Sequence, residues 1–387
     1  MLAIYLSALL LTQFFNYNFA GILPVLEARY GISAIFASWT VMVFPLMSVL
    51  TSGVSGRMID RFGYLVCTRI GLLLMVLFSG FRVFDGSFGL LLLSQSGIAL
   101  AVPLIVASLP ALLRTWFEDA EQPSVTAVCT VSLFTGIGLA LAVSPLLILA
   151  AGFHQVMVIS ASISALSCTL FLLFVPKSPP EEVPCQAADI SWLSLLRNRN
   201  VLLLYVGGFL GQGCFNAVMT WIAVIWHERQ FPLKAAGIAS SGVVFAGILG
   251  TLLIPPIADR ILHVRVALWL CLVPAIFLIH PFIWTGNLNH AYTYGSIMGF
   301  FQLPSLAISL TLLERSVLKD QIGLASGIYW TAANIGILAL SYFINLVHEV
   351  SGWHIAIHCV TALLALIVLL VAFLRVPPRA IENVPSM

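Results

Sequence analysis

The chain of 387 residues alternates between long apolar stretches and short polar connections. A helix needs roughly 20 apolar residues to cross the hydrocarbon core of a bilayer. Twelve stretches reach this length and predict twelve transmembrane helices, at 2–23, 37–56, 64–81, 88–113, 122–150, 153–175, 201–226, 236–258, 265–284, 291–314, 321–347 and 353–374. The longest interval between them, 176–200, is rich in proline and charge. It predicts a cytoplasmic linker between two six-helix halves, at 1–175 and 201–387.

Composition places most of this chain in lipid. Hydrophobic residues make up 60% of it and charged residues only 8%, against about 25% charged in a typical soluble domain. One soluble core cannot bury so much apolar surface, so the expected fold class is an all-α membrane protein surrounded by the lipid bilayer. We expect a monomer and no nucleic-acid partner.

The distribution of Lys and Arg predicts the orientation, because basic residues accumulate in cytoplasmic loops. If the N-terminus is cytoplasmic, the cytoplasmic segments carry 13 basic residues and the outer loops carry four, which are Arg29, Arg82, Arg229 and Lys234. Both termini are therefore expected in the cytoplasm, and the short loops favour a multi-pass protein of the cell inner (plasma) membrane.

The two halves are predicted to be copies of one unit. Asp60-Arg61 and Asp259-Arg260 lie 199 residues apart, each at the end of an apolar stretch. Further pairs match in order at nearly the same offset, namely Phe15-Asn16 with Phe215-Asn216, Arg29 with Arg229, Pro103 with Pro304, and Arg114 with Arg315. The pattern predicts two pseudo-symmetric bundles, and parallel repeats of this kind usually bind substrate at their interface near mid-membrane.

The stretch Gly56-x-x-x-Asp60-Arg61-x-Gly63 resembles the loop signature of the major facilitator superfamily. The resemblance implies that superfamily's twelve-helix fold and rocker-switch alternating access, with helices 1, 4, 7 and 10 lining the cavity. It also implies a gate, in which the Asp caps the start of helix 11 and the Arg pairs with nearby acidic groups. Two gating clusters are expected, Asp60 with Arg61 and Arg114, and Asp259 with Arg260 and Arg315.

A finer resemblance points to the heme-exporter/choline-transporter (feline leukaemia virus receptor-like) family. It rests on Phe245-Ala-Gly-Ile-Leu-Gly through Asp259-Arg260, on Met298-Gly-Phe-Phe, and on Gly323-Leu-Ala-Ser-Gly327 through Asn334-Ile-Gly336. That family holds choline with a Trp and two Gln residues, where this chain has Asn16, Phe134 or Leu133, and Asn334, so the aromatic cage is not reproduced. Cyanate and nitroimidazole transporter-like proteins are similar around Gln212 and Trp221-Ile-Ala.

Polar and aromatic side chains within the spans are the candidates for substrate binding. They are Gln13, Asn16, Tyr17, Gln212, Asn216, Trp221, Gln302, Trp330 and Asn334. Unpaired amides are costly in hydrocarbon, so they should face substrate, water or each other. The alternative is that they only hold neighbouring helices together. Trp226 and Trp353, at span ends, are interpreted as interfacial anchors.

No Asp, Glu, Lys or Arg lies near the middle of any predicted span. The sequence therefore predicts a secondary active or facilitative transporter of a small neutral or singly charged organic solute, uncoupled or coupled through groups at helix ends. Drug or metabolite efflux by proton antiport and a non-transporting membrane sensor are the alternatives. The histidines are scattered, with no nucleophile–base set, so no enzyme activity, metal or cofactor is expected.

Overall fold

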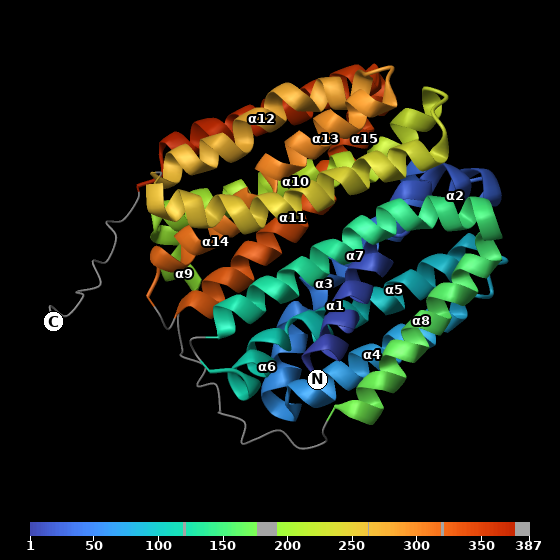
Figure 1. The fold of residues 1–387 in the computed structure, drawn as a ribbon, viewed down its shortest axis with the longest axis horizontal. Coiled ribbons are helices and arrows are strands. Elements are labelled where there is room, and N and C mark those ends of the chain that lie inside the picture. Colours follow the sequence, from blue (N-terminus) through green and yellow to red (C-terminus); the bar gives the residue numbers. More distant parts are fainter. Residues whose placement is uncertain (119–120, 176–191, 262, 319–320, 376–387) are drawn as a thin grey trace, which may run out of the picture.

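The computed structural model describes residues 1–118, 121–175, 192–261, 263–318 and 321–375. Eleven helical segments within these residues are long and apolar enough to cross a membrane. Figure 1 shows them as two groups of roughly parallel helices lying side by side, one blue to green and one yellow to red. This arrangement confirms the predicted all-α membrane fold.

The first group contains six membrane-spanning segments. The first segment, Leu2–Tyr30, is built from three pieces and the fourth, Phe88–Trp116, from two. The elements are α1 (Leu2–Tyr17), the 3-10 helix η1 (Ala20–Ile22), α2 (Leu23–Tyr30), α3 (Ala34–Phe62), α4 (Tyr64–Phe81), α5 (Phe88–Val106), α6 (Leu109–Trp116), α7 (Gln122–Ala151) and α8 (Phe153–Phe174).

The second group follows a stretch, 176–191, that lies outside the described residues, so most of the predicted linker is not described. Its elements are α9 (Trp192–Arg197), α10 (Arg199–Glu228), α11 (Leu233–Ile261), α12 (Val264–Trp284), α13 (Leu288–Gln302), α14 (Pro304–Arg315) and α15 (Ile322–Ala372). We call α1–α8 the first half and α10–α15 the second half.

A single glycine separates the last two crossings. α15 is 51 residues long and leaves helical geometry only at Gly352, where φ is 79° and ψ is 168°. Gly152 has nearly the same geometry, with φ 85° and ψ 164°, between α7 and α8. Glycine adopts positive φ without steric cost, so each one reverses the chain at the same place in its half. Counted this way, α15 supplies two of the twelve predicted crossings.

Proline marks the interruption of the fourth span in each half. Pro103 lies three residues before the end of α5, and Pro304 begins α14 directly after Leu303. Proline lacks the backbone N–H that would continue the helix ladder. The two residues are the repeat-related prolines of the sequence, so corresponding spans are broken at corresponding depths.

The helix bundle has two ends, one at each surface of the membrane, and we name them by their charge. α3 ends and α4 begins at one of them, near Arg57, Arg61 and Arg69, and we call it the basic face. α2 and α10 end at the other, near Arg29 and Glu228, and we call it the opposite face. These names do not say which face lies in the cytoplasm.

The halves meet along a seam formed by α3 and α7 from the first half and α11 and α15 from the second. α3 packs on α15 and α7 packs on α11, while η1 and α2 reach across to α10. Figure 1 shows α2 close to the second half at the end where α10 finishes. The opposite face is therefore the place where the halves are joined.

Burial along the seam helices shows that the halves separate toward the basic face. Nearly all of 37–45 in α3 is buried, whereas Leu50 is 62% and Val54 is 55% exposed. α11 changes in the same sense, from buried Ala239 to Leu249, which is 58% exposed. The structure is thus closed at the opposite face and open toward the basic face.

Candidate functional site

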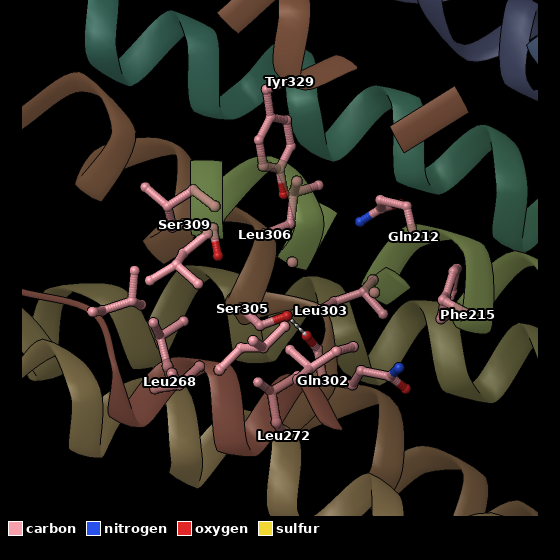
Figure 2. Close-up of a pocket in the computed structure, with 18 of the residues that line it drawn as sticks. Gln212, Phe215, Leu268, Leu272, Gln302, Leu303, Ser305, Leu306, Ser309 and Tyr329 are labelled. Carbon is pink, nitrogen blue, oxygen red and sulfur yellow. Dashed lines mark hydrogen bonds between the residues drawn. The ribbon is translucent and has the colours of Figure 1, made fainter. Parts of the chain in front are cut away.

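An open pocket reaches from the basic face into the second half (Figure 2). It encloses about 780 Å³ of space, part of it open to solvent. Its walls come from α10, α12, the end of α13, α14 and the parts of α15 before and after Gly352, and Phe134 of α7 is the first-half residue among them. The pocket lies mainly within one bundle, whereas the sequence predicted a substrate site at the interface of the two halves.

Two predicted amides line this pocket. Figure 2 shows Gln212, from α10, and Gln302, at the end of α13, in its wall. Among the described residues neither side-chain amide has a hydrogen-bond partner, although the Gln302 carbonyl accepts from Ser305 Oγ at 2.6 Å. A free amide can both donate and accept, so the two can orient a polar solute.

Aromatic side chains and serines complete the pocket, and no charged residue lines it. Phe134, Phe215 and Tyr329 supply the rings, and Ser305 and Ser309 supply hydroxyls. The sequence contained a signal for Phe215 in the repeated Phe-Asn pair. It contained none for Tyr329, because the rotation of α15 decides whether this residue or its neighbour faces the pocket.

A smaller cavity of about 240 Å³ continues deeper into the second half. Phe215 and Gln302 line both spaces, so they stand between them. The remaining walls of the inner cavity are almost wholly apolar, including Cys214, Met219 and Met298. A polar solute would therefore stop at Gln302, where the last amide is available.

Tyr17 and Asn216 meet each other across the seam. The Tyr17 hydroxyl donates to Asn216 Oδ1, and Asn216 Nδ2 donates to the Gln212 carbonyl at 2.8 Å. Both side chains are buried, at 5% exposure each. These two candidates join the halves in this conformation, which is the alternative role, holding helices together, that the sequence left open for the amides. They do not line the pocket.

The remaining polar candidates stay on their own helices. Asn16 Nδ2 donates to Gln13 Oε1 at 3.5 Å within α1, and Asn334 Nδ2 donates to the Trp330 carbonyl at 2.8 Å within α15. Trp330 is 44% exposed. The structure therefore does not bring Gln13, Asn16, Trp330 or Asn334 into the pocket with Gln212 and Gln302.

Three tryptophans have roles that differ from the predictions. Trp221 is fully buried, its Nε1 donates to the Ser341 carbonyl at 3.0 Å, and its ring lies 5.8 Å from that of Trp353. It cannot stack on a solute in this conformation. The prediction that Trp226 and Trp353 are interfacial anchors is wrong, because they are 1% and 7% exposed and pack inside the second half.

Asp60 does not make its predicted gate contacts in this conformation. Asp60 and Arg61 are both exposed, and Asp60 has no hydrogen bond or ion pair among the described residues. The residue that precedes the first turn of α15 is Gln321, and Asp60 does not cap that helix. Arg61 lies over the Phe62 ring at 5.3 Å instead.

The other gate residues divide between described and undescribed positions. Arg114 and Arg315 occupy the last turns of α6 and α14, at corresponding places in the two halves. The side chains of Asp259 and Arg260 lie outside the described part of the chain. The separation of the seam toward the basic face agrees with an unformed first cluster, since closure would bring α3 against the start of α15.

Arg82 departs most from its predicted place. It follows α4 directly and was expected in an outer loop, yet it is fully buried. None of its three guanidinium nitrogens has a hydrogen-bond partner among the described residues. Its Cζ lies 4.5 Å from the Phe19 ring centroid and 5.2 Å from that of Phe15. Burial lowers the pKa of Arg82 to about 9.

Arg82→Met should raise the melting temperature of the purified protein. At pH 7 the guanidinium is still mostly protonated, and its burial without a hydrogen-bond or ion-pair partner destabilises the fold. Even a buried ion pair can often be replaced by apolar side chains with a gain of about 1–4 kcal/mol, so a single unpaired charge should gain at least as readily. Differential scanning fluorimetry would measure the shift, with Arg82→Lys as the control that keeps the charge. A lower melting temperature for the Met variant than for the Lys variant would contradict this.

Comparison with known proteins places the chain among transporters. The model of the Major Facilitator Superfamily matches residues 5–339 and 224–387. Among curated proteins, an uncharacterized protein of Archaeoglobus fulgidus is 29% identical over 48% of this chain and 83% of its own length. Solute carrier family 49 member A3 of Danio rerio is 27% identical over 59% of this chain, which spans 52% of that protein.

The third curated relative and two solved structures extend the comparison. The choline/ethanolamine transporter flvcr2b of Danio rerio is 23% identical over 79% of this chain and 69% of its own length. A mutant of the nucleoside transporter NupG aligns with a TM-score of 0.75, covering 97% of this chain and 100% of NupG, at 14% identity. An inward-facing, unoccupied bacterial homolog of the lysosomal transporter Spinster aligns at 0.73, covering 96% and 94%, also at 14% identity.

Proposed function

The chain belongs to the Major Facilitator Superfamily, and from this premise we propose that it carries a small neutral or singly charged organic solute across the membrane by alternating access. The observation that carries the proposal is the pocket around Gln212 and Gln302, which opens on the side where the halves separate. A solute entering there meets two free amides in an uncharged pocket that also offers the hydroxyls of Ser305 and Ser309.

The chemistry of the pocket limits the charge of the solute. None of its lining residues is charged, so a doubly charged solute would lose its hydration without gaining a counter-charge. The faces of Phe134, Phe215 and Tyr329 can attract a single ammonium group. A compact monocation or a neutral polar molecule is therefore favoured, and the similarity to a choline/ethanolamine transporter makes small amino alcohols the first solutes to test.

The orientation follows from the distribution of charge. We place the basic face in the cytoplasm of a bacterial-type inner membrane, since 13 of the 17 basic residues fall in segments on the side of the termini. The chain would then be open to the cytoplasm in this conformation. The two halves, 1–175 and 201–387, act as the rocking units of one monomer, with 176–200 as their connection.

Asp60→Asn should slow transport by roughly fivefold to tenfold while leaving expression unchanged. Asp60 has no partner among the described residues, so this conformation loses nothing. In the closed basic face the variant would lose the negative charge at the N-terminus of α15, which is worth about 1 kcal/mol. Initial rates in proteoliposomes, normalised to protein content, would measure the effect. Glu118→Gln, which removes another exposed acid of this face, is the control, and equal rates for both variants would remove the gate assignment.

A ligand screen followed by transport tests the proposed function. Purified protein would be heated with choline, ethanolamine, nucleosides, monocarboxylates and dicarboxylates, because a solute that binds the folded state raises its melting temperature. We expect at least one neutral or singly charged solute to stabilise the protein and to enter proteoliposomes. If none of them stabilises it and none is transported in either direction, the proposal fails.

Variants of the pocket connect binding to the amides. Gln212→Leu and Gln302→Leu should each weaken binding of the stabilising solute by about tenfold, the usual effect of one lost hydrogen bond in a buried site. Asn334→Leu removes an amide that lies outside the pocket and should bind normally. If all three variants lost affinity for the solute equally, this pocket would not be the binding site.

A further inference from the structure

The burial patterns of the two halves repeat at an offset of 200 positions. The buried residues of α13 are Ala291, Gly295, Met298, Gly299 and Gln302, and the residues 200 positions before them are all buried in α5. α4 and α12 agree in the same way, from Cys67 and Ala267 to Arg82 and Phe282. The positive-φ glycines 152 and 352 also differ by 200. A residue of one half therefore has its counterpart 200 positions away in the other.

The inner cavity of the second half has a polar counterpart in the first half. Four positions in its wall are apolar, and their counterparts are polar. The pairs are Val218 and Asn18, Ile279 and Ser79, Val360 and Ser160, and Leu364 and Ser164. All four polar members are buried, at 4% exposure or less. At this place the first half therefore encloses hydrogen-bonding groups where the second half encloses hydrocarbon.

Two longer polar side chains occupy neighbouring counterpart positions. Arg82 corresponds to Phe282, and Gln95 corresponds to Gly295. In the second half these positions are in contact, since a Cβ built at Gly295 would lie 2.7 Å from Phe282 Cε2. Phe282 is fully buried. The fold thus accepts a neutral ring where Arg82 carries a charge, so packing alone does not require an arginine there.

Direct contacts place Arg82 at the polar cluster. Its Cζ lies 4.5 Å from the Phe19 ring centroid and 5.2 Å from that of Phe15. The counterparts of these two rings, Met219 and Phe215, line the inner cavity. α1 and α4 each pack on α5 and α8, and Figure 1 shows these four helices together in the first group. The guanidinium therefore lies inside the first half, among the counterparts of a cavity wall.

Unpartnered polar atoms gather in this cluster. Thirteen fully buried side-chain nitrogens and oxygens of the described residues have no hydrogen-bond partner, and six of them belong here. They are the three guanidinium nitrogens of Arg82, Asn18 Oδ1, Gln95 Oε1 and Ser164 Oγ. Each buried polar group without a partner costs about 1–3 kcal/mol, and a charged group costs more. A polar ligand would supply the missing hydrogen bonds.

The nearest acidic side chain in the sequence does not neutralise Arg82. Asp85 follows it by three positions, but Asp85 Oδ2 lies 2.7 Å from Arg29 Nη2, and Oδ1 lies 3.8 Å from His154 Nδ1. The neighbours of Arg82 on α1 are the aromatic rings of Phe15 and Phe19. The buried positive charge therefore lacks a protein counter-ion among the described residues, and an anion is the ligand that its chemistry selects.

We propose that Arg82 is the centre of a binding site for one small monovalent anion in the first half. The guanidinium donates to the anion, and the Ser164 hydroxyl adds a second donor. Asn18 adds a third when its amide turns its nitrogen inward. Gln95 keeps its orientation, because its Nε2 donates to the Phe15 and Thr40 carbonyls at 3.3 and 2.9 Å, and its Oε1 remains as an acceptor for the guanidinium.

The same residues limit the charge and the size of the ligand. One fixed positive charge neutralises one negative charge, whereas a divalent anion would leave a second charge buried without a partner. Arg82, Asn18, Gln95 and Ser164 are at most 2% exposed, which favours a small ion over a bulky one. A halide, nitrate or the carboxylate of a very small organic acid meets both conditions.

The anion site is separate from the solute pocket. Its residues belong to α1, α4, α5 and α8, whereas the pocket lies in the second half and takes only Phe134 from the first. An anion and a solute can therefore bind at the same time. The inference goes beyond the proposed transport function, and its test needs no transported solute.

Anion-dependent melting of the purified protein tests the site. Potassium gluconate, whose anion is bulky, is replaced stepwise by chloride, nitrate or formate at constant ionic strength, with sulfate as the divalent anion. Differential scanning fluorimetry should show a saturable rise of roughly 2–5 °C with at least one monovalent anion. Arg82→Met should lose this rise, so its expected gain in melting temperature applies at low anion concentration and shrinks as the anion is added.

Matched variants separate the site from general effects of salt. Ser164→Ala should weaken the apparent affinity for the anion about threefold to tenfold, the effect of one lost hydrogen bond. Ser162→Ala, which changes an exposed serine of the same helix, should respond as the parent does. Gln212→Leu should also respond as the parent does, because it alters the solute pocket. Isothermal titration calorimetry should give one anion bound per chain.

The choice of anions identifies the source of the negative charge. Stabilisation by chloride and nitrate without formate would indicate an inorganic anion, whereas formate acting as well or better would indicate a small carboxylate. A monocarboxylate that stabilises Gln212→Leu but not Arg82→Met binds at this site. One that stabilises Arg82→Met but not Gln212→Leu binds in the solute pocket, which keeps the two proposals distinguishable.

Four results would overturn the inference. They are a melting temperature that does not depend on the monovalent anion, an unchanged saturable response in Arg82→Met, an equal loss of affinity in Ser162→Ala and Ser164→Ala, and loss of the response in Gln212→Leu. The first of these would mean that water alone meets the buried polar atoms. None of them measures transport of a solute, so the proposed function would still stand or fall by its own ligand screen.

Discussion

Gly336→Ala should strongly destabilise the second half. A Cβ built at Gly336 would lie 2.0 Å from the Phe209 carbonyl oxygen and 2.7 Å from its carbon, which belong to the backbone of α10. The reverse contact is equally close, since a Cβ at Gly213 would lie 2.6 Å from the Gly336 oxygen. Backbone atoms cannot rotate away, so α10 and α15 would have to move apart and lose the packing between them.

The expected loss of stability is about 3 kcal/mol or more, because overpacking alone costs about 1–3 kcal/mol and here both faces of the contact are backbone. Gly327→Ala lies on the same helix, where a Cβ meets nothing within 4 Å, and serves as the control. Alanine there should be neutral or slightly stabilising. Equal melting temperatures for the two variants would show that α10 and α15 are not packed this closely.

Gly237→Ala should act on the equilibrium between conformations rather than on folding. A Cβ at Gly237 of α11 would lie 2.4 Å from the Leu141 carbonyl oxygen and 2.8 Å from Pro145 Cγ, both on α7 of the other half. The clash falls on the joined part of the seam, so separating the halves at the opposite face relieves it. We expect the closed opposite face to lose at least tenfold in population, equivalent to about 1.4 kcal/mol.

Nitroxide labels at Gly86→Cys, between α4 and α5, and at Lys234→Cys, in the first turn of α11, lie on the two halves at the opposite face. Their distance distribution would report this shift, and the melting temperature should change little. Gly80→Ala, on α4 and away from the seam, has no atom within 4 Å of the built Cβ and is the matched control. If Gly237→Ala melts far below the control while its distances stay short, the contact belongs to a rigid core and the seam does not open there.

Much of the fold could be predicted from the sequence because its signal is local. Apolar length predicts a membrane span whatever the span packs against, and the repeat-related charges and prolines recur at corresponding helix ends. The exact form of the last two crossings could not be predicted, since only one residue, Gly352, leaves helical geometry between them. Their apolar patterns predicted two helices with a gap from 348 to 352.

The site was less predictable because it depends on the rotation of each helix and on the direction of each side chain. The sequence identified Gln212 and Gln302, but Tyr17 and Asn216, equally polar, turn toward each other across the seam. The depth of a side chain within the fold is equally hard to predict from the sequence, as Arg82 shows. Its position after α4 predicts a loop residue, yet its long side chain folds inward against Phe15 and Phe19.

The open basic face could not have been predicted at all. Under the proposed alternating access, one sequence supports at least two arrangements of its halves, and their relative free energies depend on small differences at the seam. The gate cluster illustrates this, since Asp60 is correctly placed at the end of α3 and has no partner in the arrangement observed. The predicted gate contact of Asp60 refers to a conformation in which the basic face is closed.

Alternating access requires the two halves to rock about the seam, and distances at both faces in the same protein test this motion directly. Spin labels at Gly56→Cys and Gly323→Cys, where the structure has open space, report the basic face, and the pair at positions 86 and 234 reports the opposite face. A bound solute should shorten one distance while it lengthens the other. Distances that stay fixed at both faces, or that lengthen together, would contradict alternating access.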